Sequence, residues 1–256
     1  MSSEIEKIKS VQNDAWSSLR VFTAARIALG RAGVSMPLKE SLQFKMAHAH
    51  ARDAVFSVLD ENGLINALEI IHQQYFLLYS KANDRNEYLH RPDLGRRLDN
   101  DSTNQLETYT TKEFDVAVVI ADGLSATAIN VHAIPVFKLL KEKFIASNIS
   151  FAPVFIVKEG RVAIADEIGA LLKCKLSLIL IGERPGLSSP DSMGAYITYD
   201  PKPGLTDESR NCISNIRPEG LNYQAAADKI FFLVRESLRM KLSGVKLKDN
   251  TSLLQG

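Results

Sequence analysis

The carboxylate of Glu183 is the side chain of this sequence best placed to bind a ligand. It comes directly after the apolar run 176–181, where a buried strand would end. An ionised carboxylate accepts hydrogen bonds and cannot donate them. Glu183 is therefore a candidate for holding a ligand rich in N–H donors, and the alternative is a local ion pair with Arg184 or Arg217.

The thiol of Cys212 and the carboxylate of Asp122 are two further groups that could take part in a reaction. Cys212 is a candidate nucleophile, although the absence of a CxxC motif favours a small buried or ligand-facing thiol. Asp122 directly follows the apolar residues 114–121 and precedes Gly123, as expected at a strand end. Asp122 and Glu183 could therefore act as acid and base in a transferase.

No metal or nucleotide motif accompanies these residues. His48 and His50 are two positions apart, and such residues do not face each other on a helix. The other histidines lack neighbours with zinc-site spacing, so we expect no metal bound by protein ligands. The segment ADGLSATA has one glycine where a dinucleotide fingerprint has three. Ser125 in this segment either caps the next helix or begins a helix whose N-terminus faces an anionic or polar ligand.

The elements that would position these residues alternate between strand and helix beyond residue 113. Apolar and β-branched runs predict strands at 114–121, 151–157 and 176–181. Helical patterns predict helices at 126–144, kinked by Pro135, at 162–172 and at 223–242. This rhythm implies an α/β fold with a Rossmann-like, three-layer parallel sheet. Ligands bind beyond the carboxyl ends of such strands, where Asp122 and Glu183 are expected.

The first hundred residues have a helical pattern instead. It predicts helices at 15–29, 41–59 and 64–78, and a polar connection follows at 99–112. The chain then divides into a helical N-terminal region (1–100), a connection (101–113) and a Rossmann-like domain (114–256). Within that domain, residues 182–221 contain five of the nine prolines and are predicted to form a long loop of fixed shape that binds a ligand.

The composition is that of an ordinary soluble protein. The 256 residues are 45% apolar and carry a formal net charge of +1, which gives no reason to expect nucleic acid or an anionic membrane as a partner. Arg91, Arg96 and Arg97 lie close together in the sequence. Such a cluster is either a solvated face or a set of internal ion pairs, or else it contacts a phosphate or another protein. No apolar run is long enough to span a bilayer, and two cysteines fit a reduced, cytoplasmic protein.

Several segments resemble the small subunit family of ethanolamine ammonia-lyase, an adenosylcobalamin enzyme. They are TAARIALGRAG (23–33), HARDAV (50–55), RPDLGRRL (91–98), VVIADGLSATAIN (118–130), IGERPGLSSPDSMGAYITY (181–199) and NCISNIRPEGL (211–221). They follow one another in the family's order and extend over most of the chain. The resemblance implies a larger partner subunit, a β/α barrel that holds ethanolamine and most of the catalytic groups, so no catalytic residue is expected here.

The resemblance also implies where the cofactor lies. Adenosylcobalamin would bind between the two subunits, on the Rossmann-like domain of this chain, while the helical N-terminal region contacts the partner. Six such heterodimers would form the assembly. The family's cobalamin contacts match Val162, Glu183 and Cys212. Arg161 and Asp122 are further candidates, chosen for their neighbourhood and strand-end position, and Glu183→Gln is expected to weaken cobalamin binding with little effect on folding.

The expected reaction follows from the resemblance as well. Homolysis of the cofactor's Co–C bond would start a radical conversion of ethanolamine to acetaldehyde and ammonia. The D-x-H-x-x-G signature of proteins that replace the lower cobalt ligand is absent, so the base-on cofactor is expected. A cytoplasmic location is expected, with packaging in a bacterial microcompartment as an alternative. From the residues alone, a stand-alone transferase and a non-catalytic subunit whose long loop binds only protein stay open.

Overall fold

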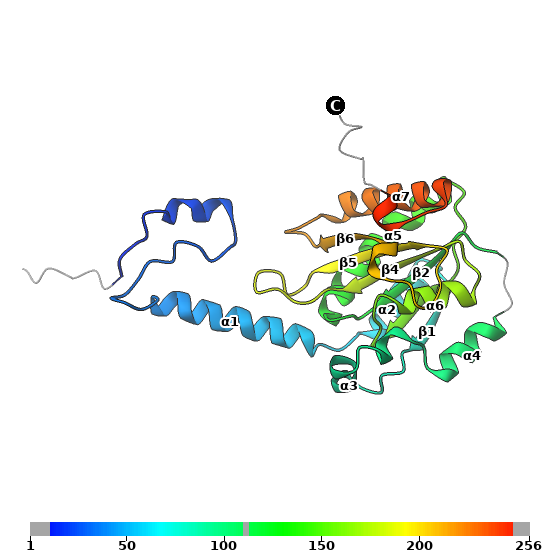
Figure 1. The fold of residues 1–256 in the computed structure, drawn as a ribbon, viewed down its shortest axis with the longest axis horizontal. Coiled ribbons are helices and arrows are strands. Elements are labelled where there is room, and N and C mark those ends of the chain that lie inside the picture. The colour runs from blue at the N-terminus through cyan, green and yellow to red at the C-terminus, as the bar shows by residue number, and fades with distance from the viewer. Residues whose placement is uncertain (1–10, 110–112, 248–256) are drawn as a thin grey trace, which may run out of the picture.

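One mixed sheet forms the centre of the molecule (Figure 1). The computed structural model describes residues 11–109 and 113–247, and within them six strands lie in the order β1-β3-β2-β4-β5-β6. The parallel strands are β1 (Tyr75–Tyr79), β3 (Val154–Lys158), β2 (Val116–Ala121) and β4 (Leu176–Gly182). Strands β5 (Met193–Tyr199) and β6 (Arg210–Ile216) extend the sheet by antiparallel pairing. The fold is therefore mixed α/β, and the expectation of a wholly parallel sheet is wrong at this edge.

Helices cover both faces of the sheet. On one face lie α5 (Ala126–Ala146), α7 (Tyr223–Met240) and α2 (Glu61–Ile70); on the other lie α6 (Ile164–Leu171) and α4 (Asn100–Thr108). Along β2, Val116, Val118 and Ile120 join the first core, while Ala117, Val119 and Ala121 join the second. A strand that buries both of its faces needs this continuous apolar run, because successive side chains point to opposite sides.

Helix α5 begins where the sequence predicted, and Ser125 is its N-cap. The Ser125 hydroxyl accepts a hydrogen bond from the backbone N–H of Ala128 at 3.4 Å and donates one to the carbonyl of Pro190 at 3.0 Å. The capping role of Ser125 is confirmed. The same hydroxyl also ties the start of α5 to the segment that follows β4.

Two helix predictions in the first hundred residues need correction. The predicted helix at 64–78 is α2, which ends at Ile70, followed by strand β1. The run YFLLY has a spacing that fits a helix, but aromatic and apolar residues there pair in register with β3. Helix α1 (Leu38–Val55) also ends earlier than the predicted residue 59. Because β1 belongs to the sheet, the first hundred residues are not purely helical.

Three segments without a clear pattern were also predicted differently. The helix expected at 15–29 is a 3-10 helix at Ser17–Phe22. The polar connection at 99–112 contains α4, whose first turn is capped by the Asp99 side chain; residues 110–112 lie outside the described part. The predicted long loop at 182–221 contains β5 and β6. The prolines of this segment suggested a loop, but they lie outside β5 and β6 and interrupt neither strand.

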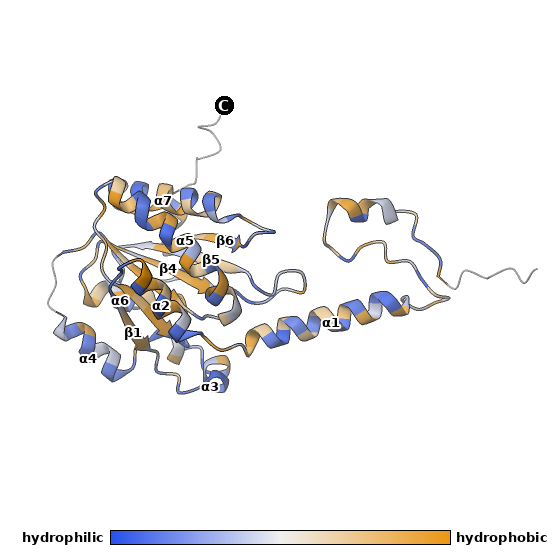
Figure 2. Cartoon of the chain, turned by 180° about the vertical axis from the view of Figure 1, so that it is seen from behind, coloured by the Kyte–Doolittle hydropathy of each residue, from blue (hydrophilic) through white to orange (hydrophobic). Residues whose placement is uncertain are grey.

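Residues 11–55, which we call the N-terminal arm, extend away from the sheet (Figure 1). Within the arm, only Pro37 and Ala54 are buried. Figure 2 shows hydrophobic residues spread along α1 and the segment before it. Phe22 is 84% exposed and Leu38 is 73% exposed. The arm thus has almost no buried core of its own. None of the described helices is apolar over a length that would cross a bilayer.

Candidate functional site

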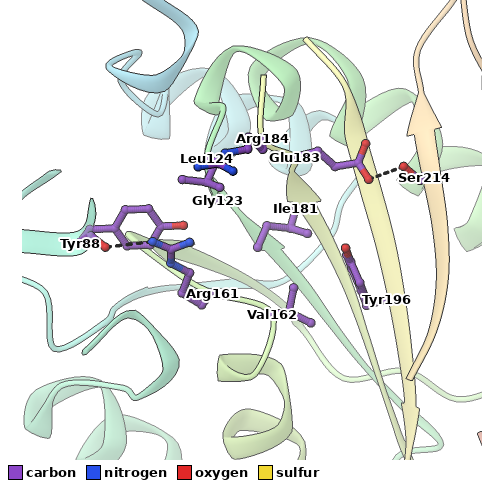
Figure 3. Close-up of a pocket in the computed structure, with 11 residues that line it drawn as sticks. Tyr88, Gly123, Leu124, Arg161, Val162, Ile181, Glu183, Arg184, Tyr196 and Ser214 are labelled. Carbon is purple, nitrogen blue, oxygen red and sulfur yellow. Dashed lines mark hydrogen bonds between the residues drawn. The ribbon is translucent and has the colours of Figure 1, made fainter. Parts of the chain in front are cut away.

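An open cleft of about 450 Å³ lies at the carboxyl ends of the three central parallel strands. It is lined by Tyr88, Gly123, Leu124, Arg161, Val162, Ile181, Gly182, Glu183, Arg184, Tyr196 and Ser214. Figure 3 shows how these residues lie around it. Helix α5 follows β2 on one face of the sheet and α6 follows β3 on the other. The cleft therefore lies where the strand order reverses, the usual ligand position in open α/β sheets. We call it the first cleft.

Two glycines bring the ends of β2 and β4 together beneath the first cleft. Gly123 has a positive φ of 57°, and a Cβ added to it would lie 2.2 Å from the Gly182 carbonyl oxygen. A Cβ added to Gly182 would lie 2.1 Å from the Ser125 carbonyl oxygen. The backbone N–H of Leu124 donates to the Gly182 carbonyl at 2.9 Å. Glu183 consequently begins directly beside the turn that follows β2.

Glu183 is held by hydrogen bonds and not by an ion pair. Its carboxylate accepts from the hydroxyl of Ser192, from the hydroxyl of Ser214 at 2.6 Å and from the backbone N–H of Asn215 at 3.1 Å. Among residues 11–109 and 113–247, no cation lies within ion-pair distance of it, and Arg217 instead pairs with Asp191 at 2.6 Å. The two oxygens offer about four acceptor positions. Glu183 therefore keeps capacity for one donor from a ligand.

Cys212 lies on β6, beside the first cleft and not in its lining. It is exposed, and it is the register partner of Tyr196, which does line the first cleft. Partial removal from water raises the pKa of the Cys212 thiol; its hydrogen bond with Tyr196 opposes this shift, and the Glu183 charge adds to it. A thiol with a raised pKa is a poor nucleophile. The arrangement favours the ligand-facing thiol over the nucleophile.

Arg161 enters the first cleft supported by Tyr88, a residue that the sequence did not single out. The Arg161 guanidinium carbon lies 4.2 Å from the centroid of the Tyr88 ring, and Nη2 donates to the Tyr88 carbonyl at 3.0 Å (Figure 3). Tyr88 is fully buried, and burial raises the pKa of its hydroxyl, which donates to the Gly160 carbonyl at 3.2 Å. The one sequence signal is the proximity of Tyr88 to the motif RPDLGRRL, whose Gly95 packs against both side chains.

Asp122 belongs to a different cavity, on the other side of the β2 end. It lines that cavity with Arg85 and Glu159, and Arg85 Nη1 lies 3.7 Å from Asp122 Oδ2 and 2.9 Å from Glu159 Oε2. Burial raises the pKa of Asp122 to about 7; the charge of Glu159 adds to the shift and that of Arg85 opposes it. Asp122 and Glu183 do not line one cavity, so the structure does not assemble them as an acid–base pair.

The histidines lie apart from the first cleft. His132 is buried, and its Nδ1 lies 2.7 Å from the Tyr223 hydroxyl while its Nε2 lies 3.5 Å from Asp191. It therefore links α5, α7 and the segment before β5. Of the candidates from the sequence, the structure brings Arg161, Val162 and Glu183 into one cleft, places Cys212 beside it and separates Asp122 from it.

Comparison with known proteins gives a consistent result. The family model described as ethanolamine ammonia-lyase light chain (EutC) matches residues 13–248. A protein of Pseudomonas fluorescens named ethanolamine ammonia-lyase small subunit is 51% identical over 97% of this chain and 92% of its own length. Proteins of the same name from Pseudomonas aeruginosa and Pseudomonas putida are 51% and 50% identical over 93% and 94% of this chain, covering 88% and 90% of their own lengths. The chain belongs to the ethanolamine ammonia-lyase light chain family.

Proposed function

We propose that this chain binds one side of adenosylcobalamin at the interface with the large subunit of ethanolamine ammonia-lyase. The observation that carries the proposal is that Arg161, Val162 and Glu183 share one open cleft at the carboxyl ends of three parallel strands. The parallel order β1-β3-β2-β4 with helices on both faces supports a Rossmann-like class for the domain. The proposed domain covers residues 114–256, and β1 completes its sheet from the N-terminal side.

The residues of the first cleft fit the edge of a corrin ring. Corrin side chains end in amides, which donate N–H groups, and Glu183 retains an acceptor position for one of them. Val162 offers an apolar contact, and the exposed Cys212 lies beside the cleft. A cleft of about 450 Å³ suits a drug-sized ligand, so a whole cobalamin extends beyond it and needs a second surface. That surface is assigned to the large subunit.

The bound cofactor, expected in its base-on form, supplies the radical chemistry that converts ethanolamine to acetaldehyde and ammonia. The residues of this chain orient it and limit access of water. Glu183 is fixed by Ser192 and Ser214, so it offers its carboxylate without a further ordering cost. No residue of this chain is assigned to the reacting atoms; the large subunit holds ethanolamine.

The N-terminal arm is proposed to contact the large subunit. Its exposed apolar side chains, among them Val21 and Phe22 at 80% and 84% exposure, have no core to join within the described chain. Large exposed apolar patches mark protein interfaces. We propose six heterodimers in the assembly and a cytoplasmic location, with packaging in a microcompartment as the alternative.

The test uses the chain purified together with its large subunit. Adenosylcobalamin is added, and cofactor retention, the absorption spectrum and ammonia release are measured. Val162→Glu, which places a charge in the first cleft, is compared with Val245→Glu at an exposed position outside it. We expect cofactor retention to be lost only in Val162→Glu. Complex formation without cofactor binding would indicate a non-catalytic subunit, and ammonia release by this chain alone would overturn the proposal.

A further inference from the structure

A second cleft, of about 590 Å³, adjoins the first across Arg161 and Val162, which line both. Its lining contains both apolar residues and four arginines: Pro92, Asp93, Arg96, Arg97, Arg161, Val162, Ala163, Glu167, Pro203, Gly204, Leu205, Thr206, Asp207 and Arg210. The motif RPDLGRRL thus meets the loop after β3 here, where Arg161 N–H donates to the Gly95 carbonyl at 2.7 Å. A ligand in the first cleft can continue into the second by passing over Val162.

Two of the three carboxylates that line the second cleft are already neutralised. Asp93 pairs with Arg91 at 2.7 Å, and Glu167 pairs with Arg97 at 3.1 Å. Asp207 lies 3.2 Å from Arg210. Arg210 also pairs with the buried Asp166, so Asp207 is only partly neutralised, whereas Asp93 and Glu167 each have an arginine of their own.

Two arginines of the second cleft form no ion pair in the described part of the chain. Within residues 11–109 and 113–247, no carboxylate lies at ion-pair distance from Arg96 or Arg161, in contrast to Arg97 and Arg210. The contact of Arg161 with the Tyr88 ring and carbonyl fixes its guanidinium at the wall between the clefts. Two positive charges at one cleft attract an anion, because neither is held in an ion pair and Asp93, the carboxylate whose charge interacts with Arg96, is already paired with Arg91.

Unused N–H donors accompany these charges. Arg161 Nε is buried without a hydrogen-bond partner. Arg210 Nε is likewise buried and unpartnered, on a side chain only 2% exposed that lines the second cleft. In the described part of the chain, the backbone N–H groups of Val162 and Ala163 have no acceptor, and no side chain caps α6. Arginines together with free backbone N–H groups at the start of a helix are a phosphate-binding combination.

We propose that Arg96, Arg161 and the N–H groups of Val162 and Ala163 bind a phosphate group in the second cleft. In the assembly, the ligand is the phosphodiester in the nucleotide tail of the cobalamin whose corrin edge occupies the first cleft. This assignment of the source rests on the proposed function; the phosphate chemistry of the site does not. Val162, which comes directly before the N-cap of α6 and lines both clefts, then contacts the cofactor where ring and tail meet.

The experiment compares two cofactor forms bound to the complex of this chain with its large subunit. Adenosylcobalamin carries the phosphodiester, whereas adenosylcobinamide lacks the nucleotide tail. Arg161→Gln is expected to weaken adenosylcobalamin binding about ten- to a hundredfold, the loss typical of a charge-assisted hydrogen bond. Adenosylcobinamide binding is expected to weaken less, because Arg161 also lines the first cleft but loses only its contact with the corrin edge there. Arg96→Gln, at an exposed position where the described chain gives its side chain no hydrogen bond or ion pair, is expected to act in the same direction. The matched control is Arg239→Gln, an exposed ion-paired arginine on α7.

Equal weakening of both cofactor forms, or of neither, would overturn the assignment to the tail. A second measurement does not depend on cobalamin: inorganic phosphate is titrated into the full chain and followed by phosphorus NMR. Saturable binding that is lost in Arg96→Gln and kept in Arg239→Gln supports the phosphate site even if the complex binds no cobalamin, in which case only the proposed function fails. Absence of both phosphate binding and discrimination between the cofactor forms overturns the inference.

Discussion

The guanidinium of Arg161 rests on the ring of Tyr88, with 4.2 Å between the guanidinium carbon and the ring centroid. The same ring lies 4.7 Å from the guanidinium carbon of Arg85. One buried tyrosine thus contacts both Arg161 in the wall of the first cleft and Arg85 in the cavity that Asp122 lines. Its contacts come from α3 (Arg85–His90) and from the loop after β3, so this support exists only in the folded chain.

Replacement of Tyr88 tests this support. Tyr88→Phe removes the hydrogen bond to the Gly160 carbonyl and is expected to lower the free energy of unfolding by about 1 kcal/mol. Tyr88→Leu also removes the ring beneath two guanidinium groups and is expected to cost about 3 kcal/mol. Urea unfolding of both variants measures the difference. An equal loss in the two variants would show that the ring contacts do not stabilise the fold.

Glu183→Gln is expected to affect folding as well as ligand binding. The carboxylate accepts three hydrogen bonds that join the ends of β4, β5 and β6. In the glutamine variant one of the two oxygens is replaced by an NH₂ group, which cannot accept the hydrogen bonds that this oxygen accepted. We expect a loss of about 1–2 kcal/mol in the free energy of unfolding. Little effect on folding, as the sequence alone led us to expect, would mean that the amide finds other partners. Ser214→Ala, which removes one donor and keeps the carboxylate, is the matched variant.

Asp122 is expected to make stability depend on pH. Its pKa of about 7 in the folded state lies above the ordinary value of 3.8, so between about pH 4 and pH 7 the folded chain holds a proton that the unfolded chain has released. The contribution of Asp122 to stability therefore falls as pH rises through this window. Asp122→Asn keeps an acceptor for the Gly160 N–H and cannot ionise, so its stability curve is expected to be flatter. Thermal unfolding at several pH values checks this, and parallel curves for the two proteins would contradict it.

The N-terminal arm is expected to contribute to assembly and little to the stability of the chain alone. Replacing both Val21 and Phe22 with serine removes apolar surface that packs on nothing buried in this chain. The melting temperature of the isolated chain is expected to stay unchanged, while association with the large subunit weakens. Analytical ultracentrifugation measures the association, and Ile145→Ser, at an exposed position on α5, is the control. A lower melting temperature without an effect on association would contradict the proposed contact.

The sequence by itself determined the central strands and helices of the sheet and the residues at the carboxyl ends of those strands. Strands β2 and β4, the cap of α5 at Ser125 and the position of Glu183 at a strand end all followed from local patterns, because a doubly buried strand requires a continuous apolar run and a cap requires a hydroxyl or carboxylate. The motifs also identified the family. Local pattern failed for β1, whose YFLLY run fits either a helix or a strand until β3 pairs with it.

Only the tertiary structure decided which candidates meet. Arg161, Val162 and Glu183 converge because β2, β3 and β4 end side by side, whereas Asp122, at the same edge, turns toward Arg85 in another cavity. The strands within the predicted loop and the support of Arg161 by Tyr88 were likewise hidden from the sequence. The physical reason is that strand pairing, burial and charge pairing depend on neighbours far apart along the chain, which local residue patterns do not record.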